Sequence, residues 1–84
     1  MKSINIIDYN QSMGPLIDVQ HPIDYIKYHD PRSINIYADK LIMNHKKYLD
    51  KNKTYYIVCL KGKLSKKVVQ TLTYYGYKMI QVKY

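Results

Sequence analysis

Residues 55–67 read Tyr-Tyr-Ile-Val-Cys-Leu-Lys-Gly-Lys-Leu-Ser-Lys-Lys, an apolar run that stops at a cysteine and continues as a short basic loop. The β-branched and aromatic side chains before the cysteine predict a short buried strand. After the loop, an apolar stripe predicts an amphipathic helix that begins near Ser65, with Ser65 on its outer side, and ends at Gly76. The inward face of that helix is expected to comprise Leu64, Val68, Val69, Leu72 and Tyr75. Cys59 therefore lies at the turn of a predicted strand–loop–helix unit.

The position of Cys59, the only cysteine in the chain, admits two interpretations. A helix N-terminus and nearby lysines favour the thiolate over the thiol, and the thiolate is the reactive form. A cysteine is also a small apolar side chain that is commonly buried and inert. Lys61, Gly62 and Lys63 favour the reactive interpretation, and a purely structural cysteine stays open on the residues alone.

Length and composition indicate one small domain over residues 1–84, with 46% apolar residues and no sign of disorder. A single cysteine excludes a disulfide framework and a cysteine-rich zinc site. His21, His29 and His45 show no metal-ligand spacing, so neither a metal nor a cofactor is expected. No apolar run is long enough to span a membrane or resembles a secretory signal. We therefore expect a protein of the reducing cytoplasm without membrane attachment.

A net charge of +8, from 14 Lys and Arg against 6 acidic residues, indicates an anionic partner. Nucleic acid is one candidate, but the cations are scattered and are nearly all lysine. Many of the 11 tyrosines occupy core-like positions instead of alternating with arginine as a stacking platform. Attraction of small anions is the better-supported expectation, and nucleic-acid binding is kept as the weaker alternative.

The rest of the chain alternates between predicted strands and helices. Pro22 suits a first helical position, and a short helix through residues 23–28 is expected to bury Ile23 and Ile26. Asp39 is expected to cap the second helix. Asp18 interrupts an apolar strand and needs hydrogen-bond partners. The alternation predicts a largely parallel sheet covered by helices, with ligands bound at the carboxyl ends of the strands. Strands are expected at residues 4–7, 16–19, 33–36, 55–58 and 77–82, and helices at residues 23–28, 40–50 and 65–75.

The turn after Cys59 resembles the active-site loop of the rhodanese family, Cys-x-x-Gly-x-x-Ser, with Gly62 and Ser65 at the glycine and serine positions. Leu-Ile-Asp-Val-Gln-His-Pro and Tyr-His-Asp-Pro-Arg-Ser-Ile-Asn-Ile are similar to the family's first and second signatures, and Gly-Tyr to the dipeptide before its last strand. The match is collinear and spans about residues 16–82. The matching segments are residues 16–22, 28–36, 56–65 and 76–77.

The resemblance implies a rhodanese-like, three-layer α/β/α fold with a mostly parallel sheet of about five strands, abbreviated at both ends. It also implies a sulfurtransferase in which Cys59 takes sulfane sulfur from a small anionic donor such as thiosulfate and holds it as a persulfide. The acceptor in the family is cyanide, a thiol or a protein. Asp18 and His29 match structural positions of the signatures. The loop is expected to cradle the negative charge of the persulfide with the backbone of Leu60, Lys61, Gly62, Lys63, Leu64 and Ser65.

Two departures from the family pattern leave a second function open. Gln20 stands where the family often has arginine, and Leu64 stands where many active members have arginine or a small polar residue. Gln20 removes an expected ionic partner for Asp18 or a neighbour, whereas Leu64 and the shortened ends of the fold favour a rhodanese-like binding or regulatory module with weak catalysis. The phosphatase relatives of the fold place arginine six residues after the cysteine, where this chain has Ser65, so phosphatase activity is not expected.

Both ends of the predicted fold are short. Only residues 8–15 separate the first two expected strands, whereas a parallel crossover needs about a dozen residues, so the strand at 4–7 is expected at an edge or misplaced. The helix that usually follows the family's last strand has no counterpart before Tyr84. A missing covering helix exposes apolar sheet surface, so we predict self-association, with a homodimer as the simplest form.

Overall fold

The computed structural model describes residues 2–84 and contains a five-stranded sheet in the order β1-β5-β4-β2-β3. All four pairs of neighbouring strands are parallel. The α/β class and the mostly parallel five-stranded sheet expected from the sequence are therefore confirmed. The strands are β1 (Ser3–Asn5), β2 (Leu16–Asp18), β3 (Ser33–Asn35), β4 (Thr54–Val58) and β5 (Lys78–Lys83).

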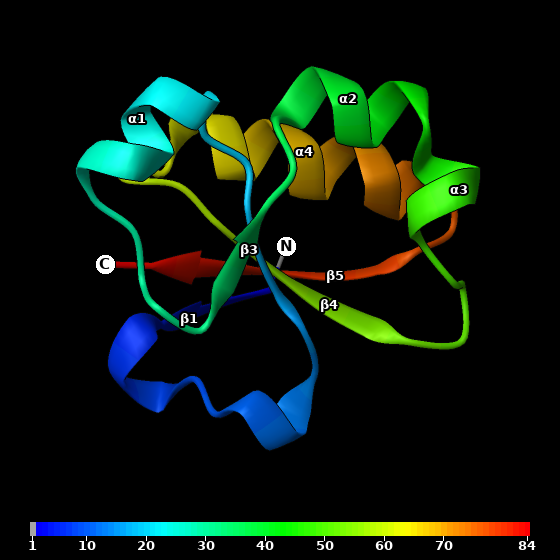
Figure 1. Cartoon of the computed structure of the whole chain (residues 1–84). Coiled ribbons are helices and arrows are strands. Elements are labelled where there is room, and N and C mark those ends of the chain that lie inside the picture. Colours follow the sequence, from blue (N-terminus) through cyan, green and yellow to red (C-terminus); the bar gives the residue numbers. More distant parts are fainter. Residues whose placement is uncertain (1) are drawn as a thin grey trace.

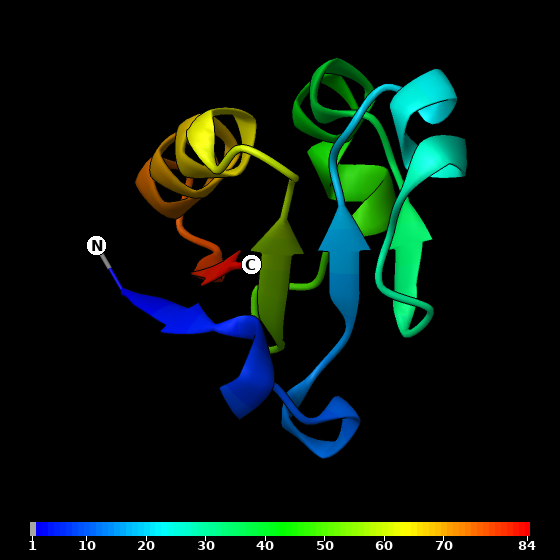
Figure 2. The same cartoon turned by 90° about the vertical axis from the view of Figure 1, so that its left-hand side faces the viewer.

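The α-helices lie above the sheet in Figure 1, and two short 3-10 helices lie below it. In Figure 2 the arrowheads of β2 and β4 point toward the same end of the sheet, where α1 and the start of α4 are found. This arrangement brings the carboxyl ends of the central strands together. The helices are α1 (Pro22–Lys27), α2 (Ala38–Met43), α3 (His45–Tyr48) and α4 (Lys63–Tyr74), with 3-10 helices η1 (Ile6–Asp8) and η2 (Gln11–Met13).

The main core lies between the sheet and the helices. It joins β4, β2 and the inward sides of α2 and α4, and Val68, Val69 and Leu72 are fully buried in it, as their spacing predicts. Two details of α4 differ from expectation. Ser65 is completely buried rather than outward, because it precedes Val68, Val69 and Leu72 by three, four and seven residues and so lies on the same buried face of α4. Tyr75 follows the helix and is 43% exposed instead of lying in the core.

A smaller cluster covers the opposite face of the sheet. Its buried members are Tyr9, Leu16, Tyr56, Val58 and Val82, and Tyr84 packs against them. The Tyr9 ring lies 5.4 Å from that of Tyr56, and its hydroxyl donates to a backbone carbonyl at 2.6 Å. Tyrosine side chains thus cover the central sheet residues on the face without α-helices.

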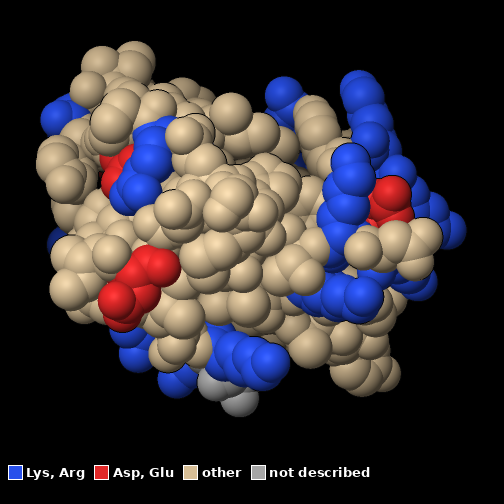
Figure 3. All heavy atoms as spheres, turned by 90° about the horizontal axis from the view of Figure 1, so that it is seen from below, with Lys and Arg blue, Asp and Glu red and all other residues tan. Residues whose placement is uncertain are grey.

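The outer surface on this side is largely uncharged over its middle (Figure 3). Here η1 and η2 expose the apolar side chains of Ile7 (85%) and Met13 (41%). Apolar exposure thus comes from these two turns, and within the sheet Ile34 of the edge strand β3 is also 56% exposed. Self-association stays a prediction, and sedimentation of the protein over a range of concentrations checks it.

The first strand explains the short N-terminal connection. β1 is confined to Ser3–Asn5 and pairs with β5, so it lies at the sheet edge and is not a neighbour of β2. The connection therefore crosses below the sheet through the two 3-10 helices η1 and η2, without an α-helix of its own (Figure 1). The expected strand at residues 4–7 is too long, because Ile6 and Ile7 turn into η1.

Three expectations about the early helices are wrong. Ile23 and Ile26 are 62% and 78% exposed, because α1 is a six-residue helix at the rim of the sheet. Asp39 does not cap α2, whose N-cap residue is Tyr37 with no side-chain hydrogen bond. The helix expected at residues 40–50 is interrupted at Asn44, which ends α2 and precedes α3.

Candidate functional site

Cys59 comes directly after β4, at the carboxyl end of the central strand. Its side chain is 4% exposed and belongs to the main core. The Sγ atom also accepts a hydrogen bond from the Ser65 backbone N–H, at 3.1 Å. The cysteine is therefore both a core residue and an acceptor for the first turn of α4. The Ser65 N–H is one hydrogen-bond donor to Sγ, whereas the sequence led us to expect several N–H groups that converge on it.

Gly62 sets the geometry of the turn between Cys59 and α4. Its φ of +80° is left-handed, a conformation that glycine adopts without strain, and it is the N-cap residue of α4. The Ser65 hydroxyl donates to the Gly62 carbonyl at 3.1 Å, so Ser65 braces the loop from inside the helix and does not cap it. The N-terminal end of this 12-residue helix therefore faces the sulfur and favours negative charge there.

Gln81 supports the same loop from β5, and the sequence analysis missed it. Its Nε2 donates to the Gly62 carbonyl at 2.8 Å and to the Ser65 hydroxyl at 3.0 Å. The side chain is 2% exposed, and its Oε1 has no hydrogen-bond partner among residues 2–84. One signal in the sequence pointed to it. Side chains two residues apart in a strand point to the same face, so Gln81 is expected on the same buried face as Met79. A polar residue at such a position needs partners in the interior.

A pocket of about 540 Å³ opens beside Cys59, and we call it the lysine pocket. Its four lysines are all exposed, so their ammonium groups lie at the rim, and none of the described lining residues is acidic. Burial raises the pKa of the lining Tyr84 to about 12, so its hydroxyl is neutral at ordinary pH. The pocket is lined by Cys59, Leu60, Lys61, Gly62, Lys63, Lys66, Gln81, Lys83 and Tyr84.

A second hollow, of about 600 Å³, reaches Cys59 from the side of α1. Leu64 lines it while also packing against the main core, which places an apolar wall next to the loop. Cys59 is thus shared by the two hollows. We call the second one the tyrosine groove; it is lined by Gln20, His21, Asp24, Lys27, Tyr28, Tyr37, Cys59, Leu60, Lys61, Lys63, Leu64 and Lys67.

Asp18 lies at the carboxyl end of β2 and is fully buried. Burial raises the pKa of its carboxyl, and hydrogen bonds from the backbone N–H and Nε2 of Gln20, both at 2.9 Å, oppose that rise. Gln20 therefore replaces an ionic partner with two neutral donors. Asn35 ties the same strand end by donating to the carbonyls of Asp18 and Gln20. Asp18 lines neither hollow, so its contacts are those of a structural residue.

Each histidine has a local partner in the structure. His29 stacks on the Tyr25 ring at 3.7 Å and pairs through Nδ1 with the Tyr25 carbonyl. His21 accepts from the Ile23 N–H and so caps α1, and His45 pairs with the Tyr77 hydroxyl at 2.7 Å. The sequence showed no partner for either of these last two. Within residues 2–84 no group of three or more histidine, cysteine or acidic side chains is placed to hold a metal ion.

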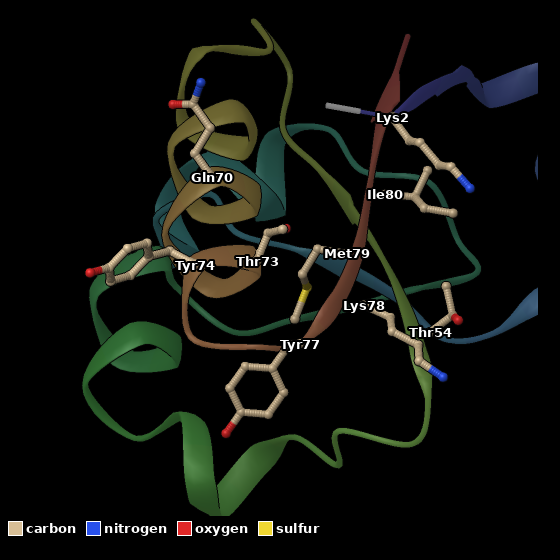
Figure 4. Close-up of a pocket in the computed structure, with 9 residues that line it drawn as sticks. All are labelled: Lys2, Thr54, Gln70, Thr73, Tyr74, Tyr77, Lys78, Met79 and Ile80. Carbon is tan, nitrogen blue, oxygen red and sulfur yellow. The ribbon is translucent and has the colours of Figure 1, made fainter.

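A third hollow, of about 640 Å³, lies at the opposite end of α4 (Figure 4). Figure 4 shows Thr73 and Met79 on one side of β5 and Lys78 and Ile80 on the other. No cysteine, histidine or acidic residue belongs to its described lining. We call it the amino-end hollow, because it lies where β4 and β5 begin; it is lined by Lys2, Thr54, Gln70, Thr73, Tyr74, Tyr77, Lys78, Met79 and Ile80.

Comparison with known proteins matches this geometry to one family. The model of the rhodanese-like domain matches residues 4–83. A rhodanese-related protein from Thermoplasma volcanium superimposes with a TM-score of 0.84 at 29% identity, over 99% of this chain and 84% of that one. A rhodanese-like domain protein from Staphylococcus aureus gives 0.80 at 28%, over 99% and 85%. A rhodanese from E. coli, solved with anions, gives 0.69 at 28%, over 81% of each chain.

The comparison with curated proteins found no significant match. Of the helices in residues 2–84, none combines the length and the hydrophobicity needed to cross a membrane.

Proposed function

Because the chain belongs to the rhodanese-like domain family, we propose that it is a sulfurtransferase or sulfur carrier that works through Cys59. The Cys59 thiolate attacks the outer sulfur of a donor such as thiosulfate. A new S–S bond forms at Sγ, the S–S bond of thiosulfate breaks, and sulfite leaves with the electron pair. The terminal sulfur of the resulting persulfide is then attacked by cyanide, a thiol or a protein thiol, which regenerates the Cys59 thiolate. A preformed thiolate needs no general base.

One observation carries the proposal: the only thiol of the chain sits under the N-terminus of α4, 3.1 Å from the Ser65 N–H. A hydrogen-bond donor aimed at the reacting sulfur stabilises negative charge there, on the thiolate and on the persulfide. The lysine pocket provides access for an anion to the same sulfur. Both features serve a sulfur anion at Cys59, and a buried inert thiol has no need of them.

Persulfide formation is the direct test. The reduced protein is incubated with thiosulfate, and its intact mass is expected to increase by one sulfur atom, with the Cys59→Ser variant unchanged. Added cyanide is expected to remove that sulfur as thiocyanate. If a folded protein with an accessible thiol takes no sulfur from thiosulfate, from a polysulfide or from a protein persulfide, the enzymatic proposal is wrong.

Leu64 favours a second candidate, a rhodanese-like binding module with weak catalysis. Its side chain is half-buried against the main core, so no cation stands at that position of the loop. This module would bind anions in the lysine pocket without turnover. Calorimetric binding of thiosulfate, with no sulfur transferred to Cys59 and no loss of binding in Cys59→Ser, would select it.

A further inference from the structure

Two consecutive tyrosines at the end of α4 are exposed to solvent. Tyr74, the last residue of the helix, is 87% exposed, and Tyr75, which was expected in the core, is 43% exposed. Figure 4 shows the Tyr74 side chain pointing outward from α4, away from β5. Adjacent exposed aromatic rings are a feature of surfaces that bind another molecule.

These tyrosines begin a row of aromatic rings across the amino end of the sheet. Ring centroids lie 6.0 Å apart for Tyr74 and Tyr75 and 5.0 Å apart for Tyr75 and His45. The His45 and Tyr77 rings follow at 5.4 Å and are joined by a hydrogen bond of 2.7 Å. Because Tyr77 is buried, the inner half of the row is fixed, and the outer two rings are available to a ligand.

Lysines surround the amino-end hollow beside this row. Lys2 and Lys78 line the hollow together with Tyr74 and Tyr77, and no acidic residue belongs to its described lining. The Nζ atom of Lys51 lies 5.5 Å from the centroid of the Tyr77 ring. Figure 3 shows cationic side chains gathered on its right-hand side, where α3 and the start of β4 lie in Figure 1. Aromatic and cationic groups therefore meet on one surface.

The sequence concentrates positive charge in its second half. Residues 40–84 carry eleven lysines and a single acidic residue, Asp50, so the excess of positive charge comes from this half. The lysine pocket accounts for four of these lysines at the opposite end of the sheet. A small anion at Cys59 therefore leaves the charge of the amino end unexplained. Positive charge spread over α3, the next loop and β5 matches an anionic chain better than a single small anion.

We propose that the amino-end hollow and the exposed tyrosines beside it bind single-stranded nucleic acid. Tyr74 stacks on an unpaired base, and Lys2, Lys51 and Lys78 contact phosphates of the backbone. Gln70 and Thr73 place neutral hydrogen-bonding groups in the lining, where they can meet the edge of a base. An acidic peptide matches the charge but carries no regular series of planar rings. The surface lies at the opposite end of the sheet from Cys59, so this binding is independent of the proposed sulfur transfer.

Fluorescence anisotropy with labelled oligouridine and oligothymidine of about twelve nucleotides measures the binding. The binding constant is expected to fall with salt, with a slope of about −2 on logarithmic axes for three phosphate contacts to a single strand. A duplex of the same length offers charge without unpaired bases. Its affinity is therefore expected to be the same for the wild type and for Tyr74→Ala.

Substitutions on the surface separate stacking from charge. Tyr74→Ala is expected to weaken binding of the single strand about tenfold, whereas Tyr74→Phe keeps the ring and is expected to bind like the wild type. Lys51→Gln with Lys78→Gln is expected to reduce the salt slope to about −0.7. Lys66→Gln with Lys83→Gln is the matched control, because it removes the same charge from the lysine pocket, and its slope is expected to stay near that of the wild type.

Three results would overturn the inference. The first is the absence of single-strand binding at low salt. The second is an equal loss of affinity in the two lysine pairs with no effect of Tyr74→Ala, which would mean that net charge alone attracts the strand. The third is binding of an oligoglutamate peptide with the same dependence on Tyr74, which would assign the surface to an acidic peptide. Cys59→Ser is expected to bind the strand like the wild type, so each result is separate from the fate of the sulfur-transfer proposal.

Discussion

The two ends of the sheet carry hollows of similar size and different construction. At the carboxyl end, the lysine pocket of about 540 Å³ contains the only cysteine, a left-handed glycine and a buried glutamine that ties the loop. At the amino end, the hollow of about 640 Å³ is divided by β5, and its described lining contains no cysteine, histidine or acidic residue (Figure 4). Volume does not distinguish the two.

The difference lies in how the polar groups are held. Around Cys59 the backbone and side-chain polar atoms are connected by hydrogen bonds from α4 and β5, which fixes them in place. At the amino end β1 pairs with only the second half of β5, so the edge of Lys78–Ile80 is not covered by β1. A site that must hold a reacting atom needs the first kind of support, and three changes test this contrast.

Glycine substitutions give the largest expected effect. An added Cβ at Gly14 would lie 2.4 Å from the Thr54 carbonyl, which begins β4 at the amino end, and φ there is +150°. Because neither backbone can move freely, Gly14→Ala is expected to lower the free energy of unfolding by about 3 kcal/mol or more. Gly62→Ala meets nothing closer than 3.7 Å and costs only the left-handed conformation, about 1 kcal/mol.

Urea unfolding monitored by circular dichroism measures both glycine variants. Gly14→Ala tests a steric constraint at the amino end of the sheet. Gly62→Ala alters the loop that follows Cys59, so it is expected to slow sulfur loading far more than its loss of stability explains. Equal destabilisation by the two variants would contradict the contrast.

Charge removal gives an intermediate effect. Lys61→Gln with Lys63→Gln removes two rim charges of the lysine pocket, and loading by an anionic donor is expected to slow about tenfold at low salt. Lys2→Gln with Lys78→Gln removes two charges at the amino-end hollow and is expected to change the rate less than about twofold. Loading rates at low and high salt measure both effects, and added salt is expected to erase the difference. Equal slowing by both pairs would show that net charge, and not the pocket, attracts the donor.

Acidification gives the smallest effect and acts at the carboxyl end. The pKa of Asp18 is raised in the folded protein by burial, so the folded state binds this proton more tightly than the unfolded chain does. The cost of the buried charge is therefore fully present above the raised folded pKa and is relieved as pH falls through it. The pKa of Asp30 is lowered, chiefly by its hydrogen bond with Arg32, so its contribution is lost only as pH falls through that lower value.

Unfolding free energies of the wild type and Asp18→Asn, measured from pH 7 down to pH 4, isolate this effect, because the variant cannot titrate at that position. The advantage of the wild type over the variant is expected to grow as pH falls through the raised pKa of Asp18. A constant difference across the range would mean that burial does not perturb Asp18.

The sequence was sufficient for the elements whose side chains repeat with a clear period. Val68, Val69 and Leu72 follow the spacing of a helix and are fully buried, and the apolar run before Cys59 forms the central strand β4. The order of elements and the resemblance to rhodaneses then predicted a mostly parallel sheet of about five strands. Periodicity failed for α1, because a six-residue helix at the rim buries too little surface for Ile23 and Ile26 to be covered.

Residues that act through tertiary contacts were harder to find. Gln81 is 22 residues from Cys59 in sequence, and only the pairing of β4 with β5 brings it under the loop. Ser65 was predicted to face outward, but its spacing from Val68, Val69 and Leu72 is that of a single helix face, and the structure buries all four residues on that face. The match to the loop motif singled out Gly62 and Ser65 but did not show which contacts hold them.

The chain has a single cysteine, and that cysteine is nearly buried. In the proposed reaction, both facts affect how long the transferred sulfur stays on Cys59. A persulfide is commonly discharged by a neighbouring thiol, which attacks the inner sulfur, closes a disulfide and expels hydrosulfide. This chain has no second cysteine to do so, and Cys59 is 4% exposed, which hinders attack by another copy. Release then waits for an outside nucleophile small or extended enough to reach the sulfur, and the residence time of the cargo is set by the concentration of that nucleophile.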